Sequence, residues 1–167
     1  MTAPSAPPIQ QQYDALTQAV ALIDRSDIGR LYLAGEDALD LLDRLSTNAL
    51  QDLAVGHGAS TVLTSNKGRI VDVLFVLQEE DSLFVLTGPG NQETVSSWID
   101  FYTIIEDVTY RDLTRETAIF SLAGPDAPTT LGALLPAQTE VPNAHEAVSA
   151  VIGGVQATII RTDFIGA

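Results

Sequence analysis

The sequence predicts an α+β domain in which helices pack on largely antiparallel sheets. Three observations predict this class. Short apolar runs bounded by glycine, proline or acidic residues recur through the chain, as is typical of strands. Several of these runs follow one another across short turns with no helix between them, which indicates antiparallel pairing. Other segments repeat their apolar residues at helical spacing, so helices complete the predicted domain.

The N-terminal part predicts a helix, a strand and a second helix. Residues 1–12 are polar and proline-rich, and we expect a disordered lead-in there. Apolar side chains at helical spacing predict an amphipathic helix over 13–24. The run 29–35 lies between glycines and indicates a strand. Two acids then open a predicted helix over 36–45, whose apolar series at i, i+3, i+4 and i+7 begins at Ala38.

Strands dominate the middle of the chain. The segments 60–64, 69–78 and 82–87 are joined by short polar turns, which predicts an antiparallel meander. The second of them is nearly all apolar, as in a strand buried on both faces. One carboxylate, Asp72, interrupts it.

The last part of the chain alternates between helices and strands. Asn91 is a candidate N-cap for a helix with an apolar stripe that includes Trp98. The chain stops directly after a strong strand, so we expect the domain 13–167 to be shortened at its C-terminus. The remaining predicted elements are strands at 108–113 and 118–122, a helix at 127–135, a loop at 136–146, and a hairpin of 148–152 and 155–162.

Composition limits the possible function classes. The net charge of −14 opposes the phosphate contacts that nucleic-acid binding needs, so we expect no direct nucleic-acid partner. The absence of cysteine excludes disulfides and thiol catalysis within this chain, and two histidines far apart argue against a metal site. No apolar run approaches the roughly 20 residues of a membrane span, and the start does not resemble a signal peptide. We therefore expect a cytoplasmic protein with no membrane partner.

Asp72 is the residue with the clearest potential for chemistry. A carboxylate within an apolar strand costs several kcal/mol unless it is paired, hydrogen-bonded or neutralised. Two interpretations have about equal weight. The carboxylate either lies at an exposed position or bonds an arginine or backbone amide, or it faces a ligand cavity and accepts hydrogen bonds there.

Other candidate residues are basic or lie in glycine-rich turns. Arg69 and Arg161 could together hold a ligand that carries carboxylates, although ordinary surface ion pairs are the favoured interpretation for each alone. The amides of 88–90 and Asn91 could face an anion at a helix start, but a simple turn is favoured there. The sequence contains no nucleophile motif, dinucleotide fingerprint or Walker A loop, and we expect no catalytic residue in this chain.

The sequence contains five segments that follow one another in the order and register of a known family: 23–30, 35–38 with 45–48, 66–72, 122–127 and 161–166. Together they resemble the glycine-cleavage T-protein family. Each match is weak alone, but their order makes the resemblance fairly specific. It implies a T-protein-like N-terminal fold with tetrahydrofolate in a central cavity. True members transfer a methylene unit from an aminomethyl-lipoyl carrier to that folate.

Departures from the family pattern point to its non-transferase, YgfZ-type branch. The Asp-Asp pair of the transferases is Asp72-Val73 here, so the resemblance implies that the transferase carboxylate is missing. Ser60 stands for a tyrosine, Ala167 for a glutamate, and the Gly-Trp opening is absent. The YgfZ branch is associated with iron–sulfur cluster maintenance and, indirectly, tRNA modification. Its Lys-Gly-Cys-Tyr motif would lie beyond this chain.

These considerations predict a folate-binding protein of the YgfZ type. The alternatives are an aminomethyltransferase or related folate-dependent one-carbon transferase, and a non-catalytic interaction domain. We expect Asp72 to bond the pterin region, and Arg69 or Arg161 to meet the glutamate tail. A homodimer could form through an apolar seam left by a missing C-terminal part. The predicted folate-binding residues are Asp72, Asn91, Arg69, Arg161 and Phe164.

Overall fold

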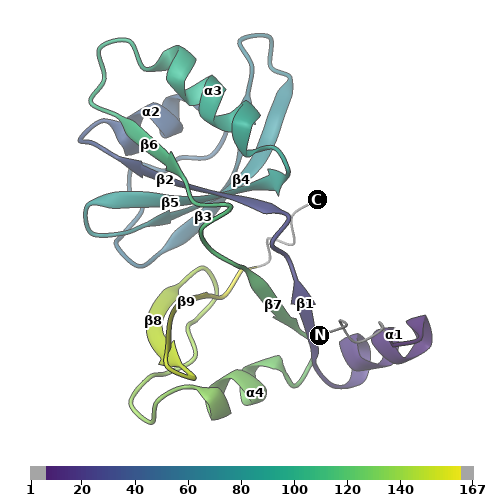
Figure 1. Cartoon of the computed structure of the whole chain (residues 1–167). Helices are drawn as coiled ribbons and strands as arrows, with labels where there is room; N and C mark the ends of the chain where they lie inside the picture. Colours follow the sequence, from purple (N-terminus) through teal and green to yellow (C-terminus); the bar gives the residue numbers. More distant parts are fainter. Residues whose placement is uncertain (1–6, 163–167) are drawn as a thin grey trace.

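The computed structural model describes residues 7–162, so the predicted site residue Phe164 lies outside the described part. Figure 1 shows an upper layer, made of a five-stranded sheet and two helices, above a lower layer of two helices and two small sheets. The predicted α+β class with antiparallel sheets is confirmed. Among the described residues, no helix combines the length and apolar character needed to cross a membrane.

The five-stranded sheet is antiparallel throughout and contains the predicted meander. Its glycine-, asparagine- and acid-rich turns allow each strand to return beside the previous one. The strands occur in the spatial order β3 (Gly58–Thr64), β4 (Ile70–Gln78), β5 (Ser82–Pro89), β2 (Ile28–Ala34) and β6 (Thr109–Asp112).

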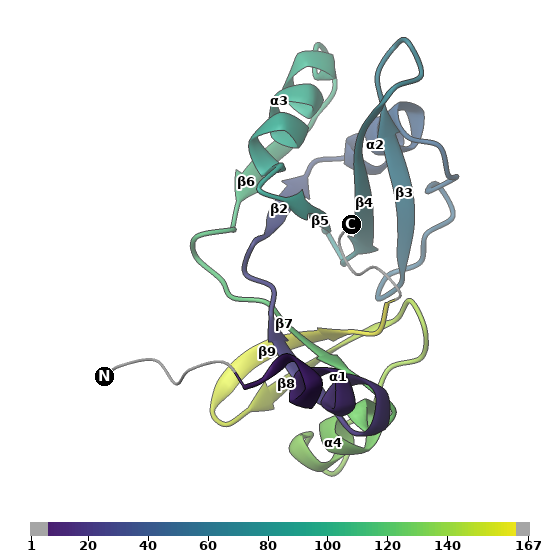
Figure 2. The same ribbon diagram turned by 90° about the vertical axis from the view of Figure 1, so that its right-hand side faces the viewer.

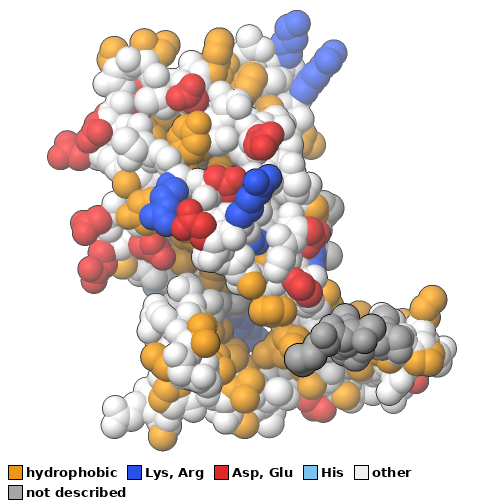
Figure 3. All heavy atoms as spheres, in the orientation of Figure 1, with side chains coloured by type: hydrophobic (Ala, Val, Ile, Leu, Met, Phe, Trp, Pro, Cys, Tyr) orange, Lys and Arg blue, Asp and Glu red, His pale blue; other side chains and the backbone are white. Residues whose placement is uncertain are grey.

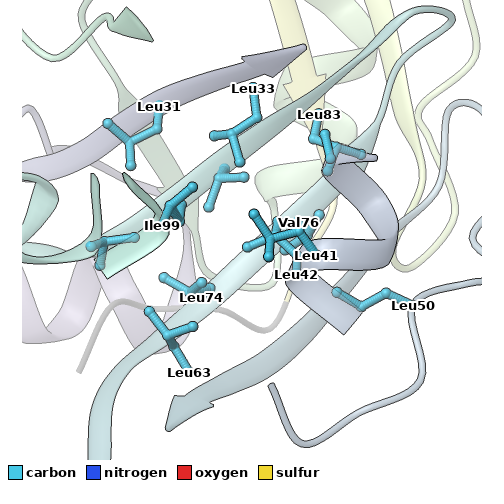
Figure 4. Close-up of a cluster of buried hydrophobic side chains, with 13 residues drawn as sticks. Leu31, Leu33, Leu41, Leu42, Leu50, Leu63, Leu74, Val76, Leu83 and Ile99 are labelled. Carbon is cyan, nitrogen blue, oxygen red and sulfur yellow. The ribbon is translucent and has the colours of Figure 1, made fainter. Parts of the chain in front are cut away.

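Helices α2 (Ala38–Leu45) and α3 (Gln92–Tyr102) cover one face of this sheet. Their apolar stripes meet alternate residues of the strands, because successive strand side chains point to opposite faces. Figure 4 shows this cluster, in which leucines from the helices and strands interdigitate. Its fully buried members include Leu31, Leu42 and Leu74.

The lower layer has little core of its own. Its hairpin packs Ala147 and Ile160 against a second cluster around Phe75, on the opposite face of the five-stranded sheet. Helix α1 and helix α4 have no buried residue. The layer contains α1 (Ile9–Gln18), β1 (Ala21–Asp24), β7 (Phe120–Ala123), α4 (Ala127–Leu134), β8 (Ala147–Ile152) and β9 (Val155–Ile160).

One long antiparallel ribbon joins the two layers. Strand β2 pairs with β6 in the upper layer, and β1 pairs with β7 in the lower one. Between them the Arg25 amide donates to the Ile119 carbonyl over 2.9 Å, so the ribbon continues through the connection. Figure 2 shows β1–β2 and β6–β7 descending side by side.

The predicted helix over 13–24 is wrong at both ends. The helix begins at Ile9, so residues 9–12 are helical rather than part of a lead-in, and it ends at Gln18. Residues 21–24 form strand β1 instead, with Leu22 opposite Leu122. Pairing with a distant strand overrides the local helical spacing at these positions.

Candidate functional site

Asp72 lies in β4, is half-buried, and bonds two backbone amides. Its Oδ2 accepts a hydrogen bond from the Gly88 amide at 2.9 Å, and its Oδ1 accepts one from the Val73 amide at 2.8 Å. The backbone pairing of β4 with β5 ends at Phe75 and Leu86. The carboxylate therefore connects the two strands beyond their last pair, as the backbone-amide interpretation predicts. A carboxylate has about four acceptor positions, so this one can accept further donors.

Gly88 allows the close approach of this carboxylate. A Cβ atom at position 88 would lie 2.7 Å from Asp72 Oδ1. This distance is shorter than the van der Waals contact between a carbon and an oxygen atom. The following Gly90 adopts φ 67°, a conformation that favours glycine. Its amide donates to the Asp27 carbonyl at 3.0 Å, and the Asn91 amide donates to the Gly88 carbonyl at 3.1 Å. Residues 88–90 thus form a bonded turn.

Asn91 occupies the N-cap position of α3 but does not cap it with its side chain. The predicted N-cap position is therefore confirmed, without a bond from the side chain to the start of the helix. Instead, Asn91 Nδ2 donates to the Val71 carbonyl at 3.3 Å, which fixes the start of α3 beside β4. The structure thus brings two of the predicted site residues together. We call the group of Asp72, Gly88 and Asn91 the β4–α3 corner.

Within the described part of the chain, neither of the two predicted arginines forms a hydrogen bond or ion pair with this corner. Arg69 is exposed in the turn before β4, where its amide donates to Ser65 Oγ at 3.1 Å and its carbonyl accepts from the Ser65 amide at 2.8 Å. Arg161 is exposed directly after β9, with its backbone bonded to Glu146 and His145. Within residues 7–162, neither guanidinium forms an ion pair or hydrogen bond. Both therefore remain available to an anionic ligand.

Two hollows flank the turn between β4 and β5, and neither is lined by the predicted site residues. One, of about 440 Å³, lies between this turn and the β8–β9 hairpin. The other, of about 470 Å³, is lined by four carboxylates and no basic side chain. Its negative field suits cations rather than folate carboxylates. The four carboxylates belong to Glu36, Glu80, Asp81 and Asp107.

Arg30 is an organising residue that sequence reasoning missed. Its side chain is 1% exposed, and its guanidinium donates to the carbonyls of Ser26, Ile28, Thr114 and Thr117. Its Nε donates to Thr117 Oγ1 at 2.8 Å. Burial lowers the pKa of Arg30, although nearby carboxylates oppose that shift. A cation inside an apolar strand was the available signal, and it is the same signal that singled out Asp72.

Glu106 organises the turn that leads from α3 to β6. Its Oε2 accepts hydrogen bonds from the amides of Ile104 and Ile105 at 2.9 and 3.1 Å. Its Oε1 accepts one from Arg44 Nη2 at 3.0 Å. The Ile104 amide, Arg44 and the Ile105 amide together lower the pKa of Glu106 to about 2. This carboxylate fixes a turn and lies apart from the corner.

Comparisons with known proteins identify relatives of this chain. The family described as "GCVT N-terminal domain" matches residues 3–167. The aminomethyltransferase of Chlorobaculum parvum is 30% identical over 158 residues, which are 93% of this chain and 43% of that protein. The aminomethyltransferase of Thermotoga petrophila is 26% identical over 159 residues, or 95% and 44%. The chain thus spans less than half the length of these relatives.

A solved structure shares the fold. The crystal structure of glycine cleavage system aminomethyltransferase T from Bartonella henselae matches with a TM-score of 0.73. The match covers 82% of this chain and 37% of that one, at 17% identity. At that identity the likeness establishes the fold alone.

Proposed function

Because the chain belongs to the GCVT N-terminal domain family, we propose that it binds tetrahydrofolate at the β4–α3 corner. The observation that carries this proposal is the half-buried Asp72 carboxylate, which two amides hold in place while acceptor positions remain open. A preorganised acceptor of this kind suits a heterocycle rich in N–H donors. The pterin ring of tetrahydrofolate is such a group.

The free arginines suit the other end of the ligand. The glutamate tail of folate carries carboxylates, and guanidinium groups bind carboxylates with paired hydrogen bonds. Arg69 and Arg161 are exposed and have no described partner, although the chain has 22 acidic residues. Asn91 would support the pterin side through its position at the start of α3. Phe164 is a further proposed contact outside the described residues.

The proposed role is that of a YgfZ-type protein, which binds folate without completing a transfer reaction. Val73 supports this role, because an apolar side chain stands where the transferases carry a second carboxylate. Val73 cannot accept or donate a proton, so the corner offers one carboxylate only. Iron–sulfur cluster maintenance, with its link to tRNA modification, is the proposed wider role of the whole protein.

A second candidate is an aminomethyltransferase, which is favoured by the names of the relatives. The relative from Chlorobaculum parvum carries that name at 30% identity. If the sequence continues as its relatives do, the whole polypeptide can be assayed for glycine-cleavage activity. Activity that is lost in Asp72→Asn would favour the transferase, and a folate-binding protein without activity would favour the YgfZ-type role.

Calorimetric titration of the chain with tetrahydrofolate tests folate binding directly. Asp72→Asn keeps one acceptor for the Gly88 amide but removes the negative charge. Because hydrogen bonds to charged groups contribute roughly 1.5–3 kcal/mol, we expect its affinity to fall by about 10- to 150-fold. The matched control is Asp52→Asn, an exposed acid outside the corner, which should bind as the unmodified chain does.

A second variant moves the carboxylate without removing it. In Gly88→Ala, the new Cβ would lie 2.7 Å from Asp72 Oδ1 and displace it. We expect weaker folate binding from this variant while circular dichroism still reports a folded chain. A folded, unmodified chain that shows no heat of binding would overturn the proposed function and leave a non-catalytic interaction domain as the better description.

A further inference from the structure

The chain contains the same series of elements twice, in two halves that each contribute to both layers. In the first half, α1 and β1 lie in the lower layer, whereas β2, α2, β3 and β4 lie in the upper one (Figure 1). In the second half the places are exchanged, because α3 and β6 lie in the upper layer and β7, α4, β8 and β9 in the lower one. The order helix, two strands, helix, two strands is therefore repeated.

One sequence motif occurs at the same place in both halves. Leu-Ala-Gly-x-Asp-Ala occupies residues 33–38, at the junction of β2 and α2, and again residues 122–127, at the junction of β7 and α4. Both of its glycines have positive φ, 124° and 118°, and a Cβ atom on either would collide with a backbone carbonyl, that of Asp107 or of Ala19. Each carbonyl precedes by two residues the strand that pairs with the strand before the glycine. The motif thus makes the same packing contact in each half.

The β3–β4 and β8–β9 hairpins share one register. Gly58 pairs with Leu77 where Ala147 pairs with Ile160, and the six successive pairs of the second hairpin match six pairs of the first. Strands β8 and β9 are therefore the counterparts of β3 and β4. The motif likewise makes β7 the counterpart of β2.

Backbone hydrogen bonds between the halves occur in exchanged pairs. The Gly58 amide donates to the His145 carbonyl at 2.7 Å, and the Ala147 amide donates to the Gly56 carbonyl at 2.8 Å. Gly56 and His145 precede the two equivalent strands by two residues, and both have positive φ, 79° and 65°. Exchanging the halves converts one bond into the other, as a twofold relation requires.

The lower layer lacks one strand that the upper layer has. In the upper sheet, β5 lies between β4 and β2 and pairs antiparallel with both. Their counterparts β9 and β7 lie in separate two-stranded sheets, and within residues 7–162 neither strand has a partner on its other edge. In the same order, the lower strands are β8, β9, a gap, β7 and β1. The lower layer therefore corresponds to the upper sheet without its central strand.

We propose that the gap between β9 and β7 is the binding site of one extended strand, supplied by the segment of the same polypeptide that follows Thr162. Connectivity selects this occupant, because in the first half β5 follows β4 directly across the turn 79–81. The matched region is 43% of the Chlorobaculum parvum relative, so a protein of that length has ample chain to supply a strand. A second copy is a poorer source, since its own β5 is already paired on both edges. The proposal does not depend on folate binding.

The two neighbouring strands determine the chemistry of the occupant. It runs antiparallel to β9 and β7, and its backbone supplies the hydrogen bonds that their open edges lack. It is apolar on both faces, because six of the eight residues of its counterpart β5 are buried. The bordering strands expose apolar side chains, with Phe120 of β7 at 58% and Val155 of β9 at 68%. Figure 3 shows apolar side chains across the lower layer, whereas most charged side chains lie on the upper layer.

A grafted strand tests the gap. A second copy of residues 79–89 replaces residues 162–167, directly after Arg161, which is the counterpart of Gln78. We expect the melting temperature to rise by at least about 4 °C, and the amides of β7 and β9 to exchange at least about 10-fold more slowly. The matched control has proline at two interior positions of the graft, which removes two backbone donors, and it should behave as the unmodified chain does.

Cysteine pairs test the register, since the chain has no cysteine of its own. Phe75 pairs with Leu86 in the upper sheet, and Thr158 is the counterpart of Phe75. Thr158→Cys should therefore form a disulfide with a cysteine at the grafted copy of Leu86. A cysteine at the grafted copy of Val85 points to the opposite face, so it should crosslink at least about 10-fold less.

Hydrogen exchange of the unmodified chain keeps the test decisive if the graft misfolds. The amides of β7 and β9 should exchange faster than those of β2 and β4, which are paired on both edges. Equal protection would overturn the proposal, as would equal crosslinking by the two cysteine pairs or a folded graft that changes neither melting temperature nor exchange. A dimer in sedimentation velocity whose β7 and β9 amides are protected would also overturn it and assign the gap to a second copy.

Discussion

Replacing Arg30 by methionine tests whether the hydrogen bonds of a buried guanidinium outweigh its desolvation. Methionine preserves much of the apolar stem and removes every donor. The guanidinium links β2 to the segment between β6 and β7, since its acceptors include the carbonyls of Ile28, Thr114 and Thr117. Losing these bonds affects both the strand and the connection to the lower layer.

The expected loss of unfolding free energy depends on what each carbonyl acceptor can bond once the guanidinium is removed. The Ile28 carbonyl is buried, and an acceptor left unsatisfied there costs about 1–3 kcal/mol. Thr114 and Thr117 lie closer to the surface, so water can replace their bonds at a smaller cost. We therefore expect Arg30→Met to lower the free energy of unfolding by about 3 kcal/mol, out of roughly 5–15 kcal/mol for a typical domain.

Urea unfolding followed by far-ultraviolet circular dichroism measures this loss. Arg30→Lys should recover little of it, because an ammonium cannot reproduce the planar fork of donors. Arg115→Met, in the same connecting segment but at an exposed position, should change stability by less than about 0.5 kcal/mol. If Arg30→Met is as stable as the unmodified chain or more so, desolvation outweighs the hydrogen bonds, and the reasoning is refuted.

Three further changes test the structure elsewhere. The pKa of Glu106 is lowered from 4.5 to about 2, so its contribution to stability is present above pH 4.5 and is lost as the pH falls toward 2. Glu106→Gln should therefore lose less stability than the unmodified chain between pH 4.5 and 2. An unchanged acid-unfolding profile would contradict this. Gly58→Ala places a Cβ 2.2 Å from Cζ of the buried Phe75, and urea unfolding should report a loss of about 1–3 kcal/mol from overpacking. Salt should raise the melting temperature by screening a net charge of −14, so a melting temperature that falls in potassium chloride would argue against dominant self-repulsion.

The sequence predicts the upper layer well because its signals are local. The meander follows from apolar runs separated by short turns, and β4 begins and ends within one residue of the predicted 69–78. Helix α2 begins at Ala38, where the apolar series begins. In these segments the residues that determine the structure are neighbours along the chain.

The remaining features depend on distant partners. Residues 21–24 become a strand because of pairing with β7, about 100 residues later. The side-chain acceptor of Arg30 Nε is 87 residues away, so no local pattern assigns its role. The candidate site could be predicted in part from local sequence. The interruption of an apolar strand identified Asp72, but its bond to Gly88 depends on the path of the next strand.

The ribbon that joins the two layers has a consequence for the order of events on the ribosome. Strand β7 emerges from the ribosome about 100 residues after its pairing partner β1. At roughly 5–20 residues per second, translation of that stretch takes about 5–20 s. During this delay the nascent β1 has an unpaired apolar edge, which chaperones recognise and neighbouring nascent chains can capture. Completion of β7 is therefore the step that gives β1 its pairing partner and ends the exposure of that edge.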